Sequence, residues 1–193
     1  TIDLIGGHYQ LTARQRAVLQ RCTSPQPDDD QRQAKLLPAQ SMRGQTLRID
    51  CFNLIILLEV ALSGSPVLFG RDQVYRDLAG LRGTYRLLPQ TDRAVELIGQ
   101  AVTRFSPQEV IFYLDQPVSN SGRLKLKILE HTASWGIPVQ VTLVHNADAV
   151  LMAAEGVVSG DSLVLDHCRS WFNLSKLIIE EMIKPVWTID LSR

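Results

Sequence analysis

The chain has 193 residues, of which 45% are hydrophobic and 21% charged, so it predicts a globular protein with a substantial core. Its formal net charge is zero, which argues against a strongly basic nucleic-acid-binding protein but leaves room for local basic patches. No apolar run approaches the roughly 18 residues that span a bilayer. The three cysteines lack CxxC spacing and are typical of free thiols in a reducing compartment. We therefore expect a cytoplasmic protein without a membrane segment.

Residues 1–46 predict an N-terminal helical arm and a linker. Residues 8–22 have the pattern of a basic helix with Thr12 as its N-cap. Residues 23–33 are rich in Ser, Pro and Gln and contain three consecutive aspartates, Asp28 to Asp30, which favours a loop. Because these aspartates lack the alternating spacing of an EF-hand, we interpret them as a solvated acidic surface and not as a calcium site.

Residues 47–193 alternate between short apolar runs and segments with helical periodicity. Such alternation predicts an α/β fold, here a three-layer sandwich with a mostly parallel central sheet covered by helices on both faces. The predicted strands are 47–51, 66–69, 109–114, 138–144, 156–158 and 186–190, and the predicted helices are 53–63, 91–104, 121–135, 147–154, 161–168 and 173–184.

Four aspartates follow the ends of apolar runs: Asp50, Asp115, Asp148 and Asp161. In open α/β folds, ligands bind in the crevice outside the carboxyl ends of the strands. Carboxylates gathered there would repel one another unless a cation lay among them. The pattern therefore indicates a divalent-metal site. Each aspartate, taken alone, is equally explained as a helix cap or as the end of a strand.

Polar neighbours of these aspartates are candidates for contacts with a substrate. Asn53 follows Asp50 by three positions, and Ser159 precedes Asp161 by two. The loop that contains Ser119, Ser121 and Arg123 offers hydroxyl groups, backbone N–H groups and a guanidinium, which suit a phosphate. An ordinary capped loop explains that segment equally well.

Residues 70–89 form a predicted loop that is rich in arginine, tyrosine and glycine. Its arginines, including Arg71, Arg76 and Arg82, are candidates for holding a polynucleotide backbone, and its tyrosines for stacking on bases. The alternative is a structural network in which Asp72 and Asp77 neutralise these arginines.

Two short motifs resemble those of a known nuclease family. Residues 49–55 (Ile-Asp-Cys-Phe-Asn-Leu-Ile) resemble the opening D-x-x-N strand of PIN-like nucleases, in particular of the NYN branch. Residues 157–162 (Val-Val-Ser-Gly-Asp-Ser) resemble the late S-G-D motif of that branch, and Asp148 falls where the family carries an acidic residue between them. The resemblance implies that Asp50, Asp148 and Asp161 bind metal, with Asp115 as a fourth, weaker match.

The whole chain also resembles a prokaryotic family of uncharacterised proteins of unknown function. The resemblance rests on residues 9–16 (Tyr-Gln-Leu-Thr-Ala-Arg-Gln-Arg), on the Arg-Asp-Leu-Ala-Gly segment at 76–80 and on the Pro-Val-Ser-Asn-Ser-Gly segment at 117–122. It implies no particular activity.

We expect a Mg²⁺- or Mn²⁺-dependent ribonuclease that acts on RNA or another phosphodiester, because oxygen ligands suit these hard cations. One alternative is a non-catalytic module on a PIN-like fold that binds nucleic acid or protein. Another is a small-molecule phosphohydrolase with the same metal site. The C-terminal helix and strand leave two interpretations open: they complete the sheet, or they bury an edge in a homodimer.

Overall fold

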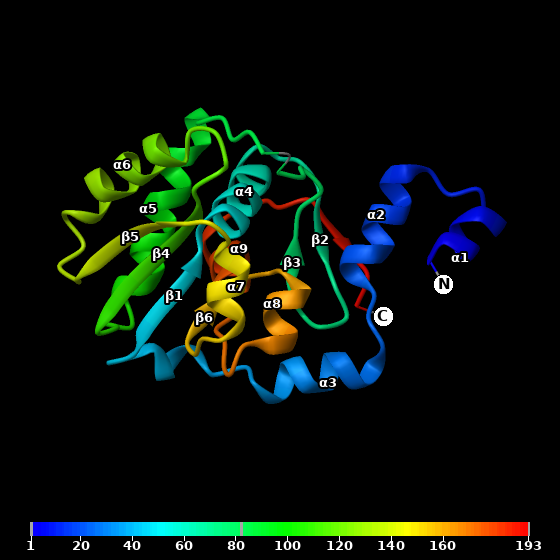
Figure 1. Cartoon of the computed structure of the whole chain (residues 1–193), viewed down its shortest axis with the longest axis horizontal. Coiled ribbons are helices and arrows are strands. Elements are labelled where there is room, and N and C mark those ends of the chain that lie inside the picture. The colour runs from blue at the N-terminus through cyan, green and yellow to red at the C-terminus, as the bar shows by residue number, and fades with distance from the viewer. Residues whose placement is uncertain (1, 82, 193) are drawn as a thin grey trace.

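The computed structural model describes residues 2–81 and 83–192, and its centre is an all-parallel four-stranded sheet. The strands lie in the order β5-β4-β1-β6 (Figure 1). Helices cover the sheet, and the predicted three-layer α/β architecture is confirmed. The strands are β1 (Thr46–Asp50), β4 (Glu109–Asp115), β5 (Val139–Val144) and β6 (Val157–Val158).

The central strands form because their apolar side chains are covered on both faces of the sheet. Leu47 and Ile49 of β1 and Phe112 and Leu114 of β4 are all fully buried. In Figure 1, α7 lies in front of the sheet and α5 lies behind it, and α8 packs beside α7. The helices of this unit are α4 (Cys51–Leu62), α5 (Pro89–Thr103), α6 (Ser121–Thr132), α7 (Ala147–Met152), α8 (Ser162–His167) and α9 (Leu174–Met182). Among the described residues, no helix has the length and apolarity needed to cross a membrane.

A second, three-stranded sheet packs beside the first. It contains β2 (Val67–Phe69), β3 (Tyr75–Arg76) and β7 (Thr188–Asp190), in the order β3-β2-β7. Of the two interpretations left open for the C-terminal strand, completion of the central sheet does not hold, because β7 pairs in parallel with β2 of the second sheet. The strand β3 lies within the segment that we predicted to be a loop. The strand β3 pairs with its near neighbour β2, whereas β7 pairs with β2 from the other end of the chain.

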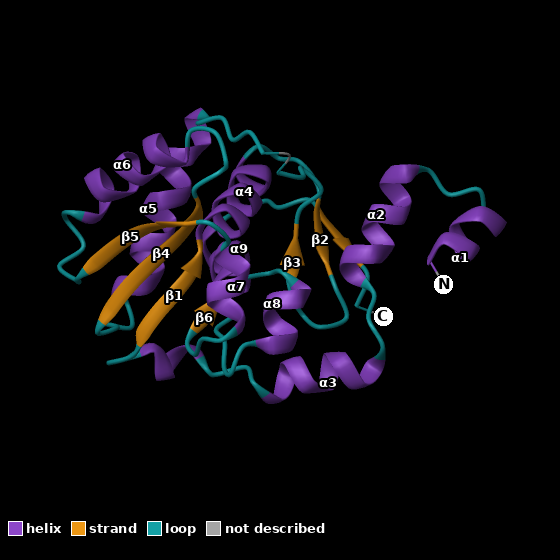
Figure 2. Ribbon diagram, in the orientation of Figure 1, coloured by secondary structure: helices purple, strands orange, loops and turns teal. Residues whose placement is uncertain are grey.

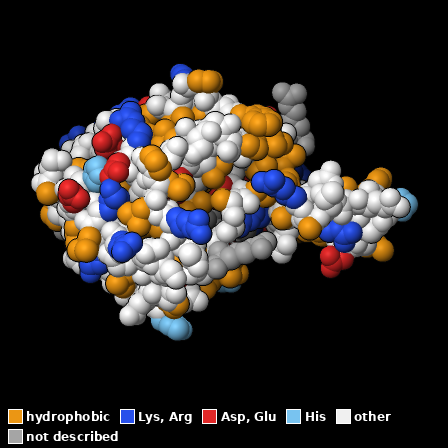
Figure 3. Space-filling view, turned by 90° about the horizontal axis from the view of Figure 1, so that it is seen from above, with side chains coloured by type: hydrophobic (Ala, Val, Ile, Leu, Met, Phe, Trp, Pro, Cys, Tyr) orange, Lys and Arg blue, Asp and Glu red, His pale blue; other side chains and the backbone are white. Residues whose placement is uncertain are grey.

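The N-terminal arm consists of α1 (Ile2–His8) and α2 (Ala13–Cys22), where one helix over residues 8–22 was predicted (Figure 2). The two helices are separated by a turn at Gln10, whose φ of 50° lies in the left-handed region. The predicted N-cap at Thr12 is confirmed, and Thr12 forms a capping box with Gln15. Viewed from above in Figure 3, the arm projects from the body of the molecule.

The predicted loop over residues 23–33 is wrong, because this segment contains α3 (Gln26–Ala34). A proline in the first turn and aspartates at its N-terminal end favour the helix locally. Burial of Asp29 and Arg32 adds tertiary support and also contradicts the prediction of a fully solvated acidic surface. A short 3₁₀-helix, η1 (Ala39–Met42), then leads into β1.

Candidate functional site

The four aspartates predicted from strand ends line a single cavity of about 130 Å³. The chain passes from β1 outward through β4 to β5 and then returns to β6 on the other side of β1. The carboxyl ends of β1 and β6 therefore meet where the strand order reverses, which is the usual ligand-binding position in open α/β sheets. We call this space the acidic cavity; its carboxylates are those of Asp50, Asp115, Asp148 and Asp161, together with Asp77.

Asp50 is the last residue of β1 and the N-cap of α4, so its position is fixed by two elements at once. One carboxylate oxygen accepts a hydrogen bond from the backbone N–H of Asn53 at 3.4 Å, and the other accepts one from the Ser159 hydroxyl at 2.7 Å. Burial, together with the smaller effect of the nearby charges of Asp148 and Asp161, outweighs the lowering effect of the two hydrogen bonds and raises the pKa of Asp50 to about 7.

Ser159 connects the two principal aspartates and does not face a substrate. Its hydroxyl donates to Asp50 and accepts a hydrogen bond from the backbone N–H of Asp161 at 3.0 Å. Asp161 in turn caps α8, because one of its oxygens accepts from the N–H of Leu163 at 2.8 Å. Ser159 is buried and its hydroxyl contacts protein groups, which favours a positioning role over the predicted contact with phosphate.

Asn53 holds the turn that follows β6 close to α4. Its side-chain oxygen accepts a hydrogen bond from the backbone N–H of Gly160 at 2.8 Å. A Cβ atom at position 160 would lie 3.0 Å from that oxygen and 3.1 Å from the carbonyl oxygen of Tyr75, so a side chain there would force these neighbours to shift. Asn53 also lines the acidic cavity, which keeps its amide N–H groups next to any bound ligand.

Asp115 and Asp148 belong to the β4 and α7 side of the cavity. Asp115 accepts a hydrogen bond from the backbone N–H of Ala147 at 2.8 Å, at the start of α7. Burial raises the pKa of Asp148, and the charges of Asp161 and Asp115 raise it further. Mutual repulsion therefore links all four carboxylates, which is the electrostatic setting that a divalent cation relieves.

Carboxylate oxygens are suitable ligands for a hard cation. The present orientation of these side chains, however, does not group them around a single cation. Within residues 2–81 and 83–192, no three His, Cys, Asp or Glu side chains are grouped so as to hold a metal ion. Asp115 and Asp161 each direct one oxygen at a backbone N–H group. Cation binding would therefore require these side chains to turn toward the centre of the cavity.

The arginine-rich segment is mainly structural. Arg76 is buried, so its predicted role in holding a polynucleotide is wrong. Its guanidinium donates to Asp72 at 2.8 Å, to the carbonyl oxygen of Gly160 at 2.8 Å and to the hydroxyl of Ser162 at 3.1 Å. Arg76 therefore holds the turn that carries Asp161. Its pairing with Asp72 agrees with the alternative interpretation, in which Asp72 neutralises arginines in a structural network.

The other candidates in this segment do not line the acidic cavity or cannot be placed. Arg71 is exposed and donates to Gln26 at 2.5 Å on α3. Tyr75 and Tyr85 are buried, so the prediction that tyrosines stack on bases is wrong. Arg82 lies outside the described residues.

A buried ion-pair network connects α3 to this turn. Arg32 of α3 lies 2.8 Å from an Asp72 oxygen and 2.6 Å from an Asp166 oxygen. Although burial alone favours a higher value, Arg76 and Arg32 hold the pKa of Asp72 below its ordinary value. A chain of contacts thus runs from α3 through Asp72 and Arg76 to the two neighbours of Asp161, the carbonyl oxygen of Gly160 and the hydroxyl of Ser162.

The predicted phosphate loop before α6 lies apart from the acidic cavity. Ser119 is exposed, and its backbone pairs with the segment at Gly83 and Tyr85. The Ser121 hydroxyl is buried and donates to a carbonyl oxygen of the same loop, whereas Arg123 is exposed. None of the three predicted residues lines the cavity. The loop therefore takes no part in lining the acidic cavity, and its phosphate-binding role stays a prediction.

Arg21 is a cavity residue that the sequence motifs did not reveal. It comes from α2 of the arm and lines the acidic cavity together with Asp77. One guanidinium nitrogen donates to the backbone carbonyl oxygen of Asp77 at 2.7 Å and lies 3.8 Å from the Asp77 carboxylate. The basic character of the helix was visible in the sequence, but nothing local indicated that it reaches the strand ends.

Comparison with known proteins finds two family models and one relative. A model described as a domain of unknown function (DUF5616) matches residues 39–177, and one described as a protein of unknown function (DUF434) matches residues 1–35. The Uncharacterized protein MJ0935 of Methanocaldococcus jannaschii is 30% identical over 164 residues, which cover 85% of this chain and 78% of the relative. No solved structure matches significantly.

Proposed function

The chain belongs to the family described as a domain of unknown function (DUF5616), and we propose that its acidic cavity is the centre of a metal-dependent phosphodiesterase that acts on RNA. One observation carries the proposal: Asp50, Asp115, Asp148 and Asp161 reach the same cavity from the ends of different strands and helices. The resemblance of residues 49–55 and 157–162 to motifs of PIN-like nucleases supports it independently.

The proposed roles follow from the contacts of each side chain. Asp50, Asp148 and Asp161 hold Mg²⁺ or Mn²⁺, whose preferred ligands are hard oxygens. The cation supplies Lewis-acid polarisation of the phosphoryl oxygen and lowers the pKa of a bound water. Asp115, anchored at the start of α7, orients the attacking water. The oxygen of the water would form the new bond to phosphorus as the ester P–O bond breaks, the water would lose its proton to solvent, and the leaving alkoxide would take up a proton from solvent and depart as the alcohol.

Arg21 and Asn53 supply hydrogen-bond donors for the phosphate. Arg21 uses one nitrogen to contact Asp77 and retains the other N–H groups of its guanidinium. Asn53 commits its oxygen to Gly160 and retains its two amide N–H groups. Both side chains line the acidic cavity, so an anionic diester there gains positive and dipolar contacts that offset the carboxylates.

Asp148→Asn is the most selective test of this proposal. Among the described residues, Asp148 makes no hydrogen bond or ion pair, so its amide variant is expected to fold normally. We expect Mn²⁺-dependent cleavage of a fluorescently labelled single-stranded RNA to fall at least about 100-fold, because a charge that stabilises the reacting centre is lost. Asp3→Asn, on the exposed face of α1, is the matched control and is expected to leave the rate unchanged.

The substrate panel separates the alternative functions. Equal RNA cleavage by Asp148→Asn and by the unaltered protein would contradict the proposal. Hydrolysis of 4-nitrophenyl phosphate without cleavage of RNA would indicate a small-molecule phosphohydrolase. Absence of both activities, together with absence of Mn²⁺ binding in calorimetry, would indicate a non-catalytic binding module.

A further inference from the structure

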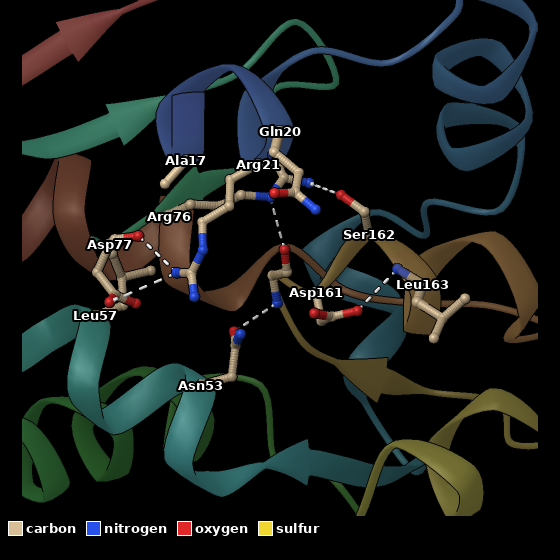
Figure 4. Close-up of a pocket in the computed structure, with 11 residues that line it drawn as sticks. Ala17, Gln20, Arg21, Asn53, Leu57, Arg76, Asp77, Asp161, Ser162 and Leu163 are labelled. Atoms are coloured by element: carbon tan, nitrogen blue, oxygen red, sulfur yellow. Dashed lines mark hydrogen bonds and ion pairs between the residues drawn. The ribbon is translucent and has the colours of Figure 1, made fainter. Parts of the chain in front are cut away.

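A second and larger cavity, of about 450 Å³, opens beside the acidic cavity (Figure 4). It lies between α2 of the arm, α4 and the start of α8, and we call it the arm cavity. Its volume falls within the roughly 300–1,000 Å³ that is usual for small-molecule sites. The two cavities share the side chains of Arg21, Asn53, Asp77 and Asp161, so a ligand that spans both would pass these four residues.

The lining of the arm cavity combines apolar surface with unused amide groups. Ala17, Leu57 and Leu163 provide side chains against which a flat ring can lie. Gln20 lies on the α2 side and is exposed, and within the described chain its amide makes no hydrogen bond. On the opposite wall, the oxygen of Asn53 contacts Gly160, and its amide N–H groups make no hydrogen bond to residues 2–81 or 83–192. Such paired amides can hydrogen-bond to both donors and acceptors on the edge of a base.

Arg21 stands at the junction of the two cavities. Its side chain is 43% exposed and contacts Asp77, and its remaining guanidinium N–H groups are available to a phosphate. A ligand with a ring in the arm cavity and a phosphate next to Arg21 therefore matches the order of chemical groups along this surface.

We propose that the arm cavity binds the nucleoside part of a nucleotide whose phosphate lies at the acidic cavity, with Gln20 and Asn53 contacting the base and Arg21 contacting the phosphate. This assignment deepens the proposed phosphodiesterase function and rests on it for the reactive position of the phosphate. The binding of a nucleotide itself does not depend on catalysis.

The composition of the cavity also explains why the arm is part of this chain. Ala17, Gln20 and Arg21 come from the segment that matches one family model, residues 1–35, whereas Asn53, Leu57 and Leu163 come from the segment that matches the other, residues 39–177. Neither segment forms the cavity alone. The arm therefore supplies the part of the cavity lining that selects the ligand, and the α/β unit supplies the carboxylates.

Ala17→Trp tests the proposal by filling the cavity, and Ala13→Trp, on the same helix but outside the lining, is its matched control. Calorimetric titration with nucleoside 5′-monophosphates in EDTA measures binding without metal or catalysis. We expect the unaltered protein to bind at least one of these nucleotides more tightly than inorganic phosphate. Ala17→Trp is expected to weaken binding at least tenfold, and Ala13→Trp to leave it unchanged. Gln20→Ala, which only removes atoms, is expected to weaken binding at least threefold.

A second readout compares two substrates with the same leaving group, a nucleoside 5′-(4-nitrophenyl phosphate) and methyl 4-nitrophenyl phosphate. We expect Ala17→Trp to lower the ratio of their kcat/KM values at least tenfold. Nucleotide binding that is absent, or that neither Ala17→Trp nor Gln20→Ala weakens, would overturn the arm cavity as a nucleoside site, even if hydrolysis is observed. Nucleotide binding with the expected losses but without any hydrolysis would uphold the nucleoside site and reject the phosphodiesterase function.

Discussion

Arg76→Met is expected to lower the free energy of unfolding by about 3–5 kcal/mol, the usual cost of removing one partner from a buried ion pair. The substitution keeps a long apolar stem but leaves Asp72 facing Arg32 alone, and it removes the contacts to the carbonyl oxygen of Gly160 and the hydroxyl of Ser162. Urea unfolding followed by circular dichroism measures this loss. The same substitution releases the turn that carries Asp161, so metal binding is expected to weaken as well.

Arg71→Met is the matched control, because Arg71 lies five positions earlier in the same segment but is exposed. Its effect on the free energy of unfolding is expected to stay within about 0.5 kcal/mol, as is usual for surface substitutions. Equal stability of the Arg71 and Arg76 variants would show that Arg76 is not part of a structural network, and would restore the arginine-rich segment as a candidate nucleic-acid contact.

Asp50→Asn is expected to stabilise the metal-free protein at pH 8 by about 4 kcal/mol and to have almost no effect at pH 4. The sign follows from the pKa of Asp50, which burial raises to about 7 in the folded protein, against an ordinary value of about 3.9 in the unfolded chain. Between these two pKa values, Asp50 is mostly protonated in the folded protein and mostly ionised in the unfolded chain. The contribution of Asp50 to stability is therefore fully present below about pH 4 and is lost as the pH rises through 7.

Urea unfolding in EDTA across this pH range measures the difference between the variant and the unaltered protein. Asp3→Asn, an exposed carboxyl on α1, is the control and is expected to show no such pH-dependent gain. Identical pH profiles for the Asp50 variant and the unaltered protein would contradict the assignment of a buried, destabilising carboxylate. In Mn²⁺ the order is expected to reverse, because the cation stabilises only the protein that retains the Asp50 carboxylate.

The convergence of the aspartates was predictable because it follows from local rules. Asp50 and Asp161 each follow an apolar strand and cap the next helix, so sequence alone indicates both the element boundary and the direction of the side chain. Parallel strands then bring their carboxyl ends to one edge of the sheet. No contact between distant residues had to be known in advance for this part of the site.

The features that sequence did not reveal depend on partners far away in the chain. The helix α3 has a polar sequence, and part of its stability comes from Arg32 reaching Asp72 and Asp166. In the sequence, Arg76 cannot be distinguished from a solvent-exposed arginine. Only the structure shows its contacts with Asp72 and Gly160. The three-residue strands β2 and β7 likewise pair across most of the length of the chain. Arg21 lies at the site because α2 packs near β2.

The most direct test of the central claim is a crystal structure of the protein grown in Mn²⁺, with an anomalous difference map calculated at the manganese edge. We expect a peak in the acidic cavity within about 2.5 Å of carboxylate oxygens of Asp50, Asp148 and Asp161. We also expect these side chains to turn inward from the orientations that they have without metal. A map without a peak in this cavity at millimolar Mn²⁺ would contradict the account and leave the carboxylates as strand ends and helix caps.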